Sequence, residues 1–224
     1  MCARFTLAAA EKVLLEAYAA ELAAEYKANW NIAPTQNSLV ITADAPNVIS
    51  PYHFGLVPHW AKDKKEGVRA LNARSETVME LKTFKPLMEK NKRCLVLADS
   101  FYEWETLDTK EKLPYRFVLP ERPVFAFAGL YSWWKDKATE EWYKSFTILT
   151  TEPNALVSKL HNRMPVILTK EEEHIWLSDD VPMADLLELC NPFPDVEMSI
   201  YRVSKEVNNV RNNHCDLILP ENTL

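Results

Sequence analysis

Short hydrophobic runs rich in β-branched and aromatic residues recur along most of the chain, separated by polar or proline-containing turns. Such runs are typical of strands. They predict strands over 38–43, 51–57, 94–99, 100–105, 114–119, 124–133, 143–151, 165–169 and 198–203. Near the beginning of the chain, Leu14, Tyr18 and Leu22 recur every four positions, which predicts an amphipathic helix over 8–26. Shorter helices are expected over 77–89, 153–161, 170–177 and 182–190.

Clusters of strands with irregularly interspersed helices indicate an α+β fold. We expect a mostly antiparallel, curved or barrel-like β-sheet core flanked by several short helices. Aromatic residues are spread from Phe5 to Tyr201, with no Ser/Gly-rich or Pro-rich gap that would mark a linker. A chain of 224 residues with 47% hydrophobic content can bury a sizeable core. We therefore predict a single domain over residues 1–224.

Glycine is scarce, which narrows the possible chemistry. With only 3 glycines, the chain can form neither a Walker-type phosphate loop nor a dinucleotide-binding fingerprint, so we expect no nucleotide cofactor. The longest uncharged apolar stretch, 123–134, is too short to cross a bilayer. The first residues lack the basic region and hydrophobic segment of a signal peptide. These features predict a cytoplasmic protein with no membrane partner.

The four cysteines, Cys2, Cys94, Cys190 and Cys215, are far apart and form no C-x-x-C pair. Disulfide and zinc frameworks are therefore unsupported, and we expect neither a metal nor another cofactor. Cys94 opens an apolar run and is interpreted as a small buried hydrophobic residue.

Cys2 differs from the other cysteines because aminopeptidases generally remove an initiator Met that precedes a small residue. Cys2 would then carry both a free α-amine and a thiol. An α-amine has a pKa of about 7.7 to 8.0 and a thiol about 8.5, so both are partly nucleophilic near neutral pH. The pair suits an aldehyde, because the amine can form a Schiff base and the thiol can then close a five-membered thiazolidine ring.

The net charge of -6 argues against nonspecific attraction to nucleic acid. The segment 62–93 departs from this average, because its basic residues outnumber its acidic ones. It could form a local positive face, although charge alone favours an ordinary solvated run of charges on a surface loop and helix. Trp60, just before this segment, can stack on an unpaired base or can belong to the core. Most other tryptophans, including Trp133, Trp134 and Trp176, are interpreted as core packing. The basic residues are Lys62, Lys64, Lys65, Arg69, Arg74, Lys82, Lys85, Lys90, Lys92 and Arg93.

A possible phosphate site precedes the predicted helix at 77–89. Thr77 and Glu80 have the spacing of a capping box, which would place Asn72 and Arg74 just before a helix N-terminus. Backbone donors, the helix dipole and a guanidinium would converge there on a phosphate. An ordinary loop with one salt bridge explains the same residues.

Two further residues have the properties of acid–base groups. In the predicted strand 100–105, Glu103 lies between Tyr102 and Trp104, and burial among aromatic rings would raise its pKa toward neutrality. A half-exposed glutamate on a polar face is the alternative. His161 would lie near the C-terminus of the helix 153–161, where the dipole favours the protonated ring. There it either donates a proton to a sugar oxygen or merely complements the helix end.

The order and identity of several motifs closely resemble the SRAP family, the SOS response-associated peptidases or abasic site processing proteins. The resemblance runs almost end to end. It is carried by MCARF at 1–5, NIAPT at 31–35, GLVPHW at 55–60, LNARSET at 71–77, FKPL at 84–87, DSFYEW at 99–104, ILTT at 148–151, HNRMPVIL at 161–168 and VSKEVNNVRN at 203–212.

The resemblance implies a role for each matching residue. Cys2 is similar to the nucleophile that forms a thiazolidine with the ring-opened deoxyribose of an abasic site. Asn72 resembles the residue that hydrogen-bonds around this linkage, and Glu103 the acid–base residue of Schiff-base formation. His161 resembles the group that assists ring opening and crosslink reversal. The implied DNA contacts are Arg4, Asn31, Pro34, Trp60, Arg74, Lys82, Thr150, Arg163, Ser204 and Asn209.

The sequence departs from the family pattern at Ala3, where the family usually has Gly. The added methyl group beside the nucleophile restricts the backbone, and the crosslinking rate is expected to differ. If Met1 stays attached, the nitrogen of Cys2 is an amide and thiazolidine chemistry is blocked.

Three hypotheses follow for the function. The first is a DNA repair protein of the SOS and DNA damage response that crosslinks covalently to abasic sites in single-stranded DNA. In this hypothesis the protein removes its own Met1, associates with the nucleoid when bound to DNA, and reverses the crosslink by lyase activity. The second is a cysteine peptidase that uses Cys2, Glu103 and His161. The third is a noncovalent module that binds single-stranded DNA.

Overall fold

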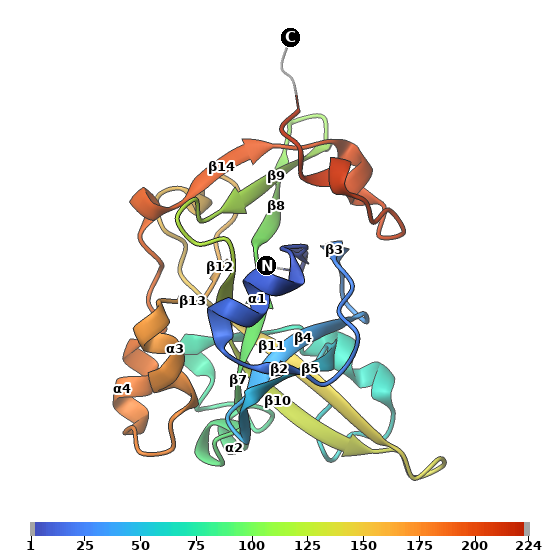
Figure 1. Ribbon diagram of the computed structural model, residues 1–224, viewed down its shortest axis with the longest axis vertical. Coiled ribbons are helices and arrows are strands. Elements are labelled where there is room, and N and C mark those ends of the chain that lie inside the picture. Colours follow the sequence, from blue (N-terminus) through green and yellow to red (C-terminus); the bar gives the residue numbers. More distant parts are fainter. Residues whose placement is uncertain (1–2, 222–224) are drawn as a thin grey trace.

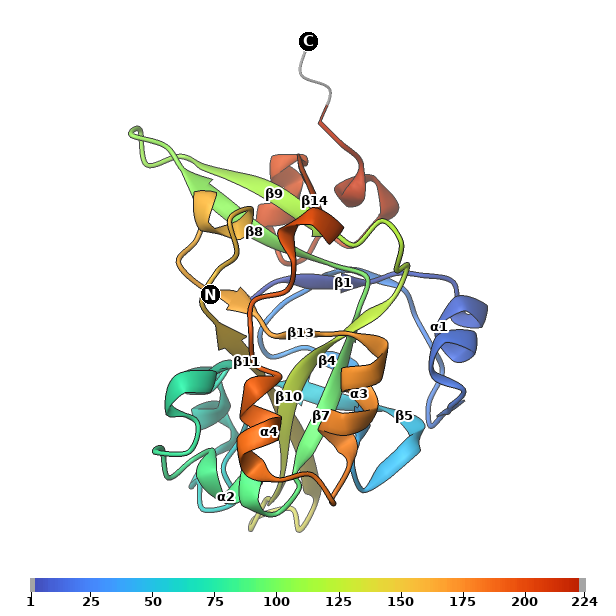
Figure 2. The ribbon, with the colours of Figure 1, turned by 90° about the vertical axis from the view of Figure 1, so that its left-hand side faces the viewer.

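The computed structural model describes residues 3–221 and contains two β-sheets with short helices around them (Figure 1). In Figure 2, β1 (Phe5–Leu7) runs between the strands of the first sheet above and those of the second sheet below. Most strand pairs are antiparallel. The predicted α+β class with a mostly antiparallel, curved sheet core is confirmed.

The first sheet has five strands in the order β14-β9-β8-β1-β3. Its register aligns Phe5 of β1 with Phe101 of β8. Because the N-terminal strand pairs with β8, the beginning of the chain lies beside the DSFYEW motif. The other strands of this sheet are β3 (Asn29–Ile32), β8 (Ser100–Thr106), β9 (Lys112–Val118) and β14 (Ser199–Arg202).

The second sheet has nine strands, with the main order β12-β11-β10-β7-β4-β5-β2. Two short strands join it elsewhere: β6 (Asn72–Arg74) pairs with β11 in parallel, and β13 (Ile167–Leu168) pairs with β10. The remaining strands are β2 (Glu21–Leu22), β4 (Asn37–Thr42), β5 (Ala45–Phe54), β7 (Arg93–Ala98), β10 (Phe125–Lys135), β11 (Trp142–Thr151) and β12 (Met164–Pro165).

Aromatic side chains fill the space between the two sheets. Phe5 of the first sheet contacts Phe54 and Phe127 of the second, with ring centroids 5.6 Å and 5.8 Å apart. Phe101 lies 6.1 Å from the same Phe127 ring. Edge-to-face pairs of this kind contribute beyond their buried area. The side of β8 that carries Phe101 therefore faces the second sheet.

Two of the predicted helices are confirmed. The predicted helix 170–177 is α3 (Lys170–Leu177), and α4 (Met183–Glu188) falls within the predicted helix 182–190. Thr169 and Glu172 form a capping box at the start of α3. The other helical segments are α1 (Glu11–Tyr18), α2 (Lys85–Glu89), η1 (Lys64–Arg69), η2 (Ser75–Thr77), η3 (Val157–Lys159), η4 (Asp195–Glu197), η5 (Lys205–Asn208) and η6 (Cys215–Ile218).

The predicted helix 8–26 was wrong at its C-terminal half. The helix α1 ends at Tyr18, because Ala19 adopts the left-handed conformation with a φ of 46°. The following segment pairs as β2 with β5. The Tyr26 hydroxyl then donates hydrogen bonds to the carbonyls of Leu7 and Ala9. Tertiary pairing thus overrides the helical periodicity at Leu22.

The predicted helices 77–89 and 153–161 were also wrong in extent. The first is reduced to η2 and α2, because Pro86 is tolerated only in the first turn of a helix. The capping box predicted at Thr77 and Glu80 does not form, since η2 ends at Thr77. The second is reduced to the single turn η3. The strand predicted over 51–57 ends at Phe54.

The surface corrects two further expectations. Arg93, counted in the predicted positive face, is buried and donates hydrogen bonds to the carbonyls of Trp176, Met88 and Ser178. Trp133, interpreted as core packing, is 46% exposed. Within residues 3–221, no helix is both long and apolar enough to cross a membrane.

We predict that Gly129→Ala destabilises the fold by about 1–3 kcal/mol through overpacking. Gly129 lies in β10 between β7 and β11, and an added Cβ would lie 2.9 Å from the Thr147 carbonyl oxygen and 2.8 Å from Val96. The free energy of unfolding in urea measures the effect, with Lys135→Ala at the exposed end of β10 as control. Equal stability of Gly129→Ala and wild type would show that the sheet relaxes around the methyl group.

Candidate functional site

Glu103 is a buried carboxylic acid in β8. Only 4% of the residue is exposed. Successive side chains in a strand point to opposite faces, so Glu103 lies on the same face as Phe101, toward the second sheet. Burial penalises the charged carboxylate and raises the pKa of Glu103 to about 7. The predicted burial and pKa shift of Glu103 agree with this geometry, and the group can accept or donate a proton near neutral pH.

The N-terminal strand is fixed directly beside Glu103. The backbone N–H of Tyr102 donates to the carbonyl of Arg4 at 2.9 Å, so the ladder between β1 and β8 extends one residue beyond Phe5. Ala3 is half-buried. Cys2, the predicted nucleophile, is outside the described residues, as is Met1. In the sequence, Cys2 stands two residues before Arg4.

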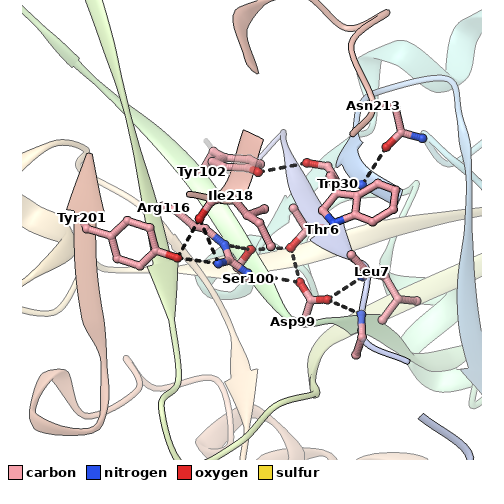
Figure 3. Close-up of polar contacts among 12 residues, drawn as sticks. Thr6, Leu7, Trp30, Asp99, Ser100, Tyr102, Arg116, Tyr201, Asn213 and Ile218 are labelled. Carbon is pink, nitrogen blue, oxygen red and sulfur yellow. Dashed lines mark hydrogen bonds and ion pairs between the residues drawn. The ribbon is translucent and has the colours of Figure 1, made fainter. Parts of the chain in front are cut away.

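A polar network fixes the other end of β1 (Figure 3). One carboxylate oxygen of Asp99 accepts hydrogen bonds from the backbone N–H groups of Ala8 and Ala9, the latter at 2.8 Å. The other oxygen accepts from the Thr6 hydroxyl and lies 3.8 Å from the guanidinium of Arg116. Hydrogen bonds to ionised groups are among the stronger ones in proteins. Asp99 therefore holds the turn that follows β1.

Arg116 extends this network to the C-terminal part of the chain. Its Nε atom donates to the Ser100 hydroxyl at 2.8 Å, and a second nitrogen donates to the Tyr201 hydroxyl at 2.5 Å. Tyr201 in turn donates to the carbonyl of Ile218 (Figure 3). The network thereby links β8, β9 and β14 to the segment η6.

Arg4 and Asn31, predicted as DNA contacts, are both buried. Arg4 donates to the side-chain oxygen of Asn31 and to the carbonyl of Val207. The Asn31 amide donates to the carbonyls of Val207, Asn209 and Asn212 at 2.9–3.2 Å. Their described contacts hold the segment 203–212 against β1 and β3, and a direct contact with DNA remains a prediction for both.

A second group of predicted residues meets across β11. The register pairs Ile148 with Asn72 and Thr150 with Arg74 on the β6 side, and Thr150 with Pro165 on the β12 side. Arg74 is exposed and Asn72 is half-buried. Among the described residues, the side-chain oxygen of Asn72 is buried and accepts no hydrogen bond. A buried acceptor in this condition favours a donor from outside the fold.

Arg163, also in this second group, forms an ion pair with Glu76. Its guanidinium donates to both carboxylate oxygens of Glu76 at 2.6 Å and 2.8 Å, and to the carbonyl of Thr150 at 2.6 Å. Arg163 is largely buried, whereas the Glu76 side chain is about half exposed. The ion pair lowers the pKa of Glu76. A phosphate that approaches Arg163 would have to compete with this carboxylate.

His161 follows the single turn η3, so the expected helix dipole is absent. Burial lowers the pKa of its ring, and the prediction of a ring held protonated by a helix end was wrong. The backbone N–H of Arg163 donates to Nδ1 at 3.0 Å. The same Nδ1 atom lies 3.2 Å from the carbonyl oxygen of Arg163, so the backbone of Arg163 orients the ring in either neutral tautomer.

Five predicted DNA contacts remain, and among them the backbone of Asn209 accepts a hydrogen bond from Asn31. Trp60 is 55% exposed, Lys82 is exposed, and Pro34 is half-buried in the loop between β3 and β4. Ser204 caps η5, where its hydroxyl accepts from the backbone of Glu206, and Asn209 ends the same turn. No finding tests their contact with DNA, so all five remain predictions.

The described part of the chain offers little other reactive chemistry. Within it, no group of His, Cys, Asp and Glu side chains is arranged to hold a metal ion. Cys94 and Cys190 are buried, and burial raises the pKa of both thiols, that of Cys190 to about 12. Cys215 is exposed. The two buried thiols are therefore unsuited to nucleophilic attack at neutral pH.

Sequence reasoning missed two supporting residues. Glu76 was overlooked because its partner Arg163 is 87 positions away in the chain. Asp99 stands at the start of DSFYEW, but its partners Ala8 and Ala9 carry no signal in their side chains, because they contribute backbone donors.

The comparisons with known proteins agree in length and in fold. The family model described as SOS response associated peptidase (SRAP) matches residues 1–210. The chain is 41% identical over 230 residues to abasic site processing protein YoaM of Bacillus subtilis (strain 168), with 99% of both chains covered. It is 43% identical over 224 residues to abasic site processing protein YoqW of Bacillus phage SPbeta, covering 97% of this chain and 99% of that protein. A crystal structure of a Bacteroides thetaiotaomicron protein matches with a TM-score of 0.83 at 27% identity, covering 92% of this chain and 93% of that one.

We predict that Glu103→Gln changes the pH dependence of stability. Between its ordinary pKa of 4.5 and a folded value of about 7, the unfolded state loses the Glu103 proton while the folded state keeps it. Wild type therefore loses up to about 3 kcal/mol of stability as pH rises through this window. The Gln variant lacks this loss, so its stability relative to wild type should be higher at pH ~8 than at pH ~4.

Urea unfolding at both pH values measures the difference. Glu76→Gln is the matched control with the opposite sign. The Glu76 pKa is lowered by Arg163, so that side chain stabilises the fold above its ordinary pKa and loses this effect as pH falls. A Glu103→Gln difference that does not vary with pH would refute the raised pKa.

Proposed function

This chain belongs to the SRAP family, and we propose that it captures abasic sites in single-stranded DNA covalently through Cys2. The observation that carries the proposal is the position of Glu103. A buried carboxyl group with a pKa of about 7 lies on β8, and the paired strand β1 begins three residues after Cys2. Capture of an aldehyde by an amine needs such a proton donor close to the N-terminus. We propose further that residues 1–224 act as one domain.

The chemistry proceeds in two steps and releases one water molecule. The α-amine of Cys2 attacks C1′ of the ring-opened deoxyribose and forms a carbinolamine. Protonated Glu103 gives its proton to the carbinolamine hydroxyl, which leaves as water and produces an iminium ion. The Cys2 thiol then gives its proton to the Glu103 carboxylate and attacks the same carbon as the thiolate. The iminium electrons return to nitrogen and complete the thiazolidine. Splitting the capture in this way replaces one difficult step by two easier ones.

The other side chains have supporting roles in this proposal. The buried acceptor oxygen of Asn72 receives a hydrogen bond from the linkage. The neutral ring of His161 donates a hydrogen bond to the sugar oxygen and so assists ring opening and crosslink reversal. Arg74 is exposed and binds the adjacent phosphate. Arg163 binds a second phosphate after that phosphate displaces Glu76.

The cellular setting completes the proposal. The crosslink shields the lesion during the DNA damage response, and the protein works in the cytoplasm at the nucleoid. Removal of Met1 is a requirement of the mechanism, because only a free Cys2 amine can form the iminium ion. The description of the family as a peptidase is consistent with autoproteolytic removal of Met1.

Incubation of the Met-free protein with single strands that carry an abasic site tests the proposal. We expect an adduct that survives denaturation in wild type and disappears in Cys2→Ser and Cys2→Ala, while noncovalent binding persists in both. Peptide cleavage without an adduct would indicate a cysteine peptidase instead. Binding without an adduct in any variant would indicate a noncovalent single-strand binding protein.

The pH dependence of crosslinking tests the role of Glu103. The rate should rise as the α-amine loses its proton, with a pKa of about 7.7 to 8.0, and fall as Glu103 ionises. Together these two effects give a bell-shaped dependence of the rate on pH, with its maximum near neutral pH. Glu103→Gln should lower the rate by about 10²–10⁴-fold and remove the alkaline limb. A Gln variant that keeps the alkaline limb would assign that limb to another group.

A further inference from the structure

Two exposed tryptophans lie together on one face of the hairpin formed by β10 and β11. The register pairs Trp133 with Lys144 and Lys135 with Trp142, and directly paired residues share a face. Trp133 is 46% and Trp142 is 61% exposed, with ring centroids 6.3 Å apart. The ammonium group of Lys144 lies 5.1 Å from the centre of the Trp133 ring. This face therefore combines aromatic surface with positive charge.

The opposite face of the hairpin packs in a small hydrophobic cluster. Trp134 and Tyr143 lie there and pack against Val57 and Ala61. The indole N–H of Trp134 donates to the carbonyl of Ala61 at 2.8 Å. The exposed pair Trp133 and Trp142 is not part of this cluster. The indole N–H of Trp133 donates to the Tyr52 hydroxyl at 3.1 Å, so this ring is held in place while much of it stays exposed beside Trp142. A contiguous exposed aromatic patch of this kind points to a binding role.

The exposed face borders a hollow of about 250 Å³. This volume is below the range typical of sites that enclose drug-sized ligands, so the hollow suits one nucleotide unit held from one side. Its described lining contains no carboxylate. Of the two lysines in the lining, Lys92 forms an ion pair with Asp44 at 2.6 Å. Lys90 forms no ion pair within the described residues. The lining that matters here is His59, Lys90, Lys92, Tyr131, Trp133 and Trp142.

We propose that this hollow is a second DNA-binding site, which takes a nucleotide of unpaired DNA remote from the lesion. The base stacks on Trp142 or Trp133 and the phosphate contacts Lys90. Indole rings that stack on bases beside cations are the general means of binding single strands. A duplex would keep its bases stacked and unavailable to these rings, so the occupant is a single strand. This inference rests on the proposed function insofar as DNA is the partner.

The distance along β11 determines which nucleotide of the bound DNA reaches the hollow. Trp142 and Thr150 stand at opposite ends of this strand, and eight residues at about 3.3 Å each separate them by about 26 Å. The nucleotide in the hollow is therefore several positions away from one held at Arg74 and Arg163. A strand confined to the first site cannot reach the hollow.

The test compares two oligonucleotides that carry a non-reactive abasic analogue, one short and one long enough to span both sites. The full chain carries Cys2→Ala, so that only noncovalent affinity is measured by fluorescence anisotropy. Trp142→Ala should weaken binding of the long strand about tenfold and leave the short strand unchanged. For Lys90→Ala, the slope of log K against log salt concentration for the long strand should become shallower by about 1. Val196→Ala, at an exposed position elsewhere, and Lys12→Ala are the controls.

Equal long-strand affinity of Trp142→Ala, Lys90→Ala and their controls would overturn the second site. The crosslinking rate of a short strand, measured with Cys2 restored, separates this outcome from failure of the proposed function. If wild type forms no adduct but Trp142→Ala still weakens the long strand, the covalent mechanism fails and the second site stands. If wild type forms the adduct and Trp142→Ala does not weaken the long strand, the covalent mechanism stands and the second site fails.

Discussion

The burial of one carboxyl group between two sheets is the constraint on which the site depends. Strand alternation places Glu103 on the face of β8 that packs against Phe127, and loss of solvation raises its pKa to about 7. A buried acid is unfavourable for the fold at neutral pH, so the surrounding structure must hold it in place. The pairing of β1 with β8 and the Asp99 network provide this rigidity.

Neighbouring groups set the orientation and charge of the proposed DNA-binding residues around β11. Glu76 holds the Arg163 guanidinium with two hydrogen bonds, so the cation is oriented before any phosphate arrives. Burial keeps His161 neutral, and the Arg163 backbone orients its ring. The buried oxygen of Asn72 adds an acceptor. In the free protein, internal partners thus hold the side chains that are proposed to bind DNA. Bound DNA would replace some of these partners.

The sequence predicted features that depend on neighbouring residues. The alternation around Glu103 indicated its burial and raised pKa, and the apolar runs located most strands. Features that depend on distant partners were missed. The helix over 8–26 was wrong because pairing of β2 with β5 decides that segment, and the charge of His161 was wrong because the expected helix is a single turn. Pro86 was a local signal against the helix 77–89 that went unused.

In the folded protein, Glu103 is expected to titrate near neutral pH. Carbon-detected NMR of the glutamate carboxyl groups measures this directly, and the spectrum of Glu103→Gln identifies the signal. We expect a titration midpoint at about 7. A midpoint at the ordinary glutamate value of about 4.5 would contradict it, because a carboxyl group ionised at neutral pH cannot protonate the departing hydroxyl.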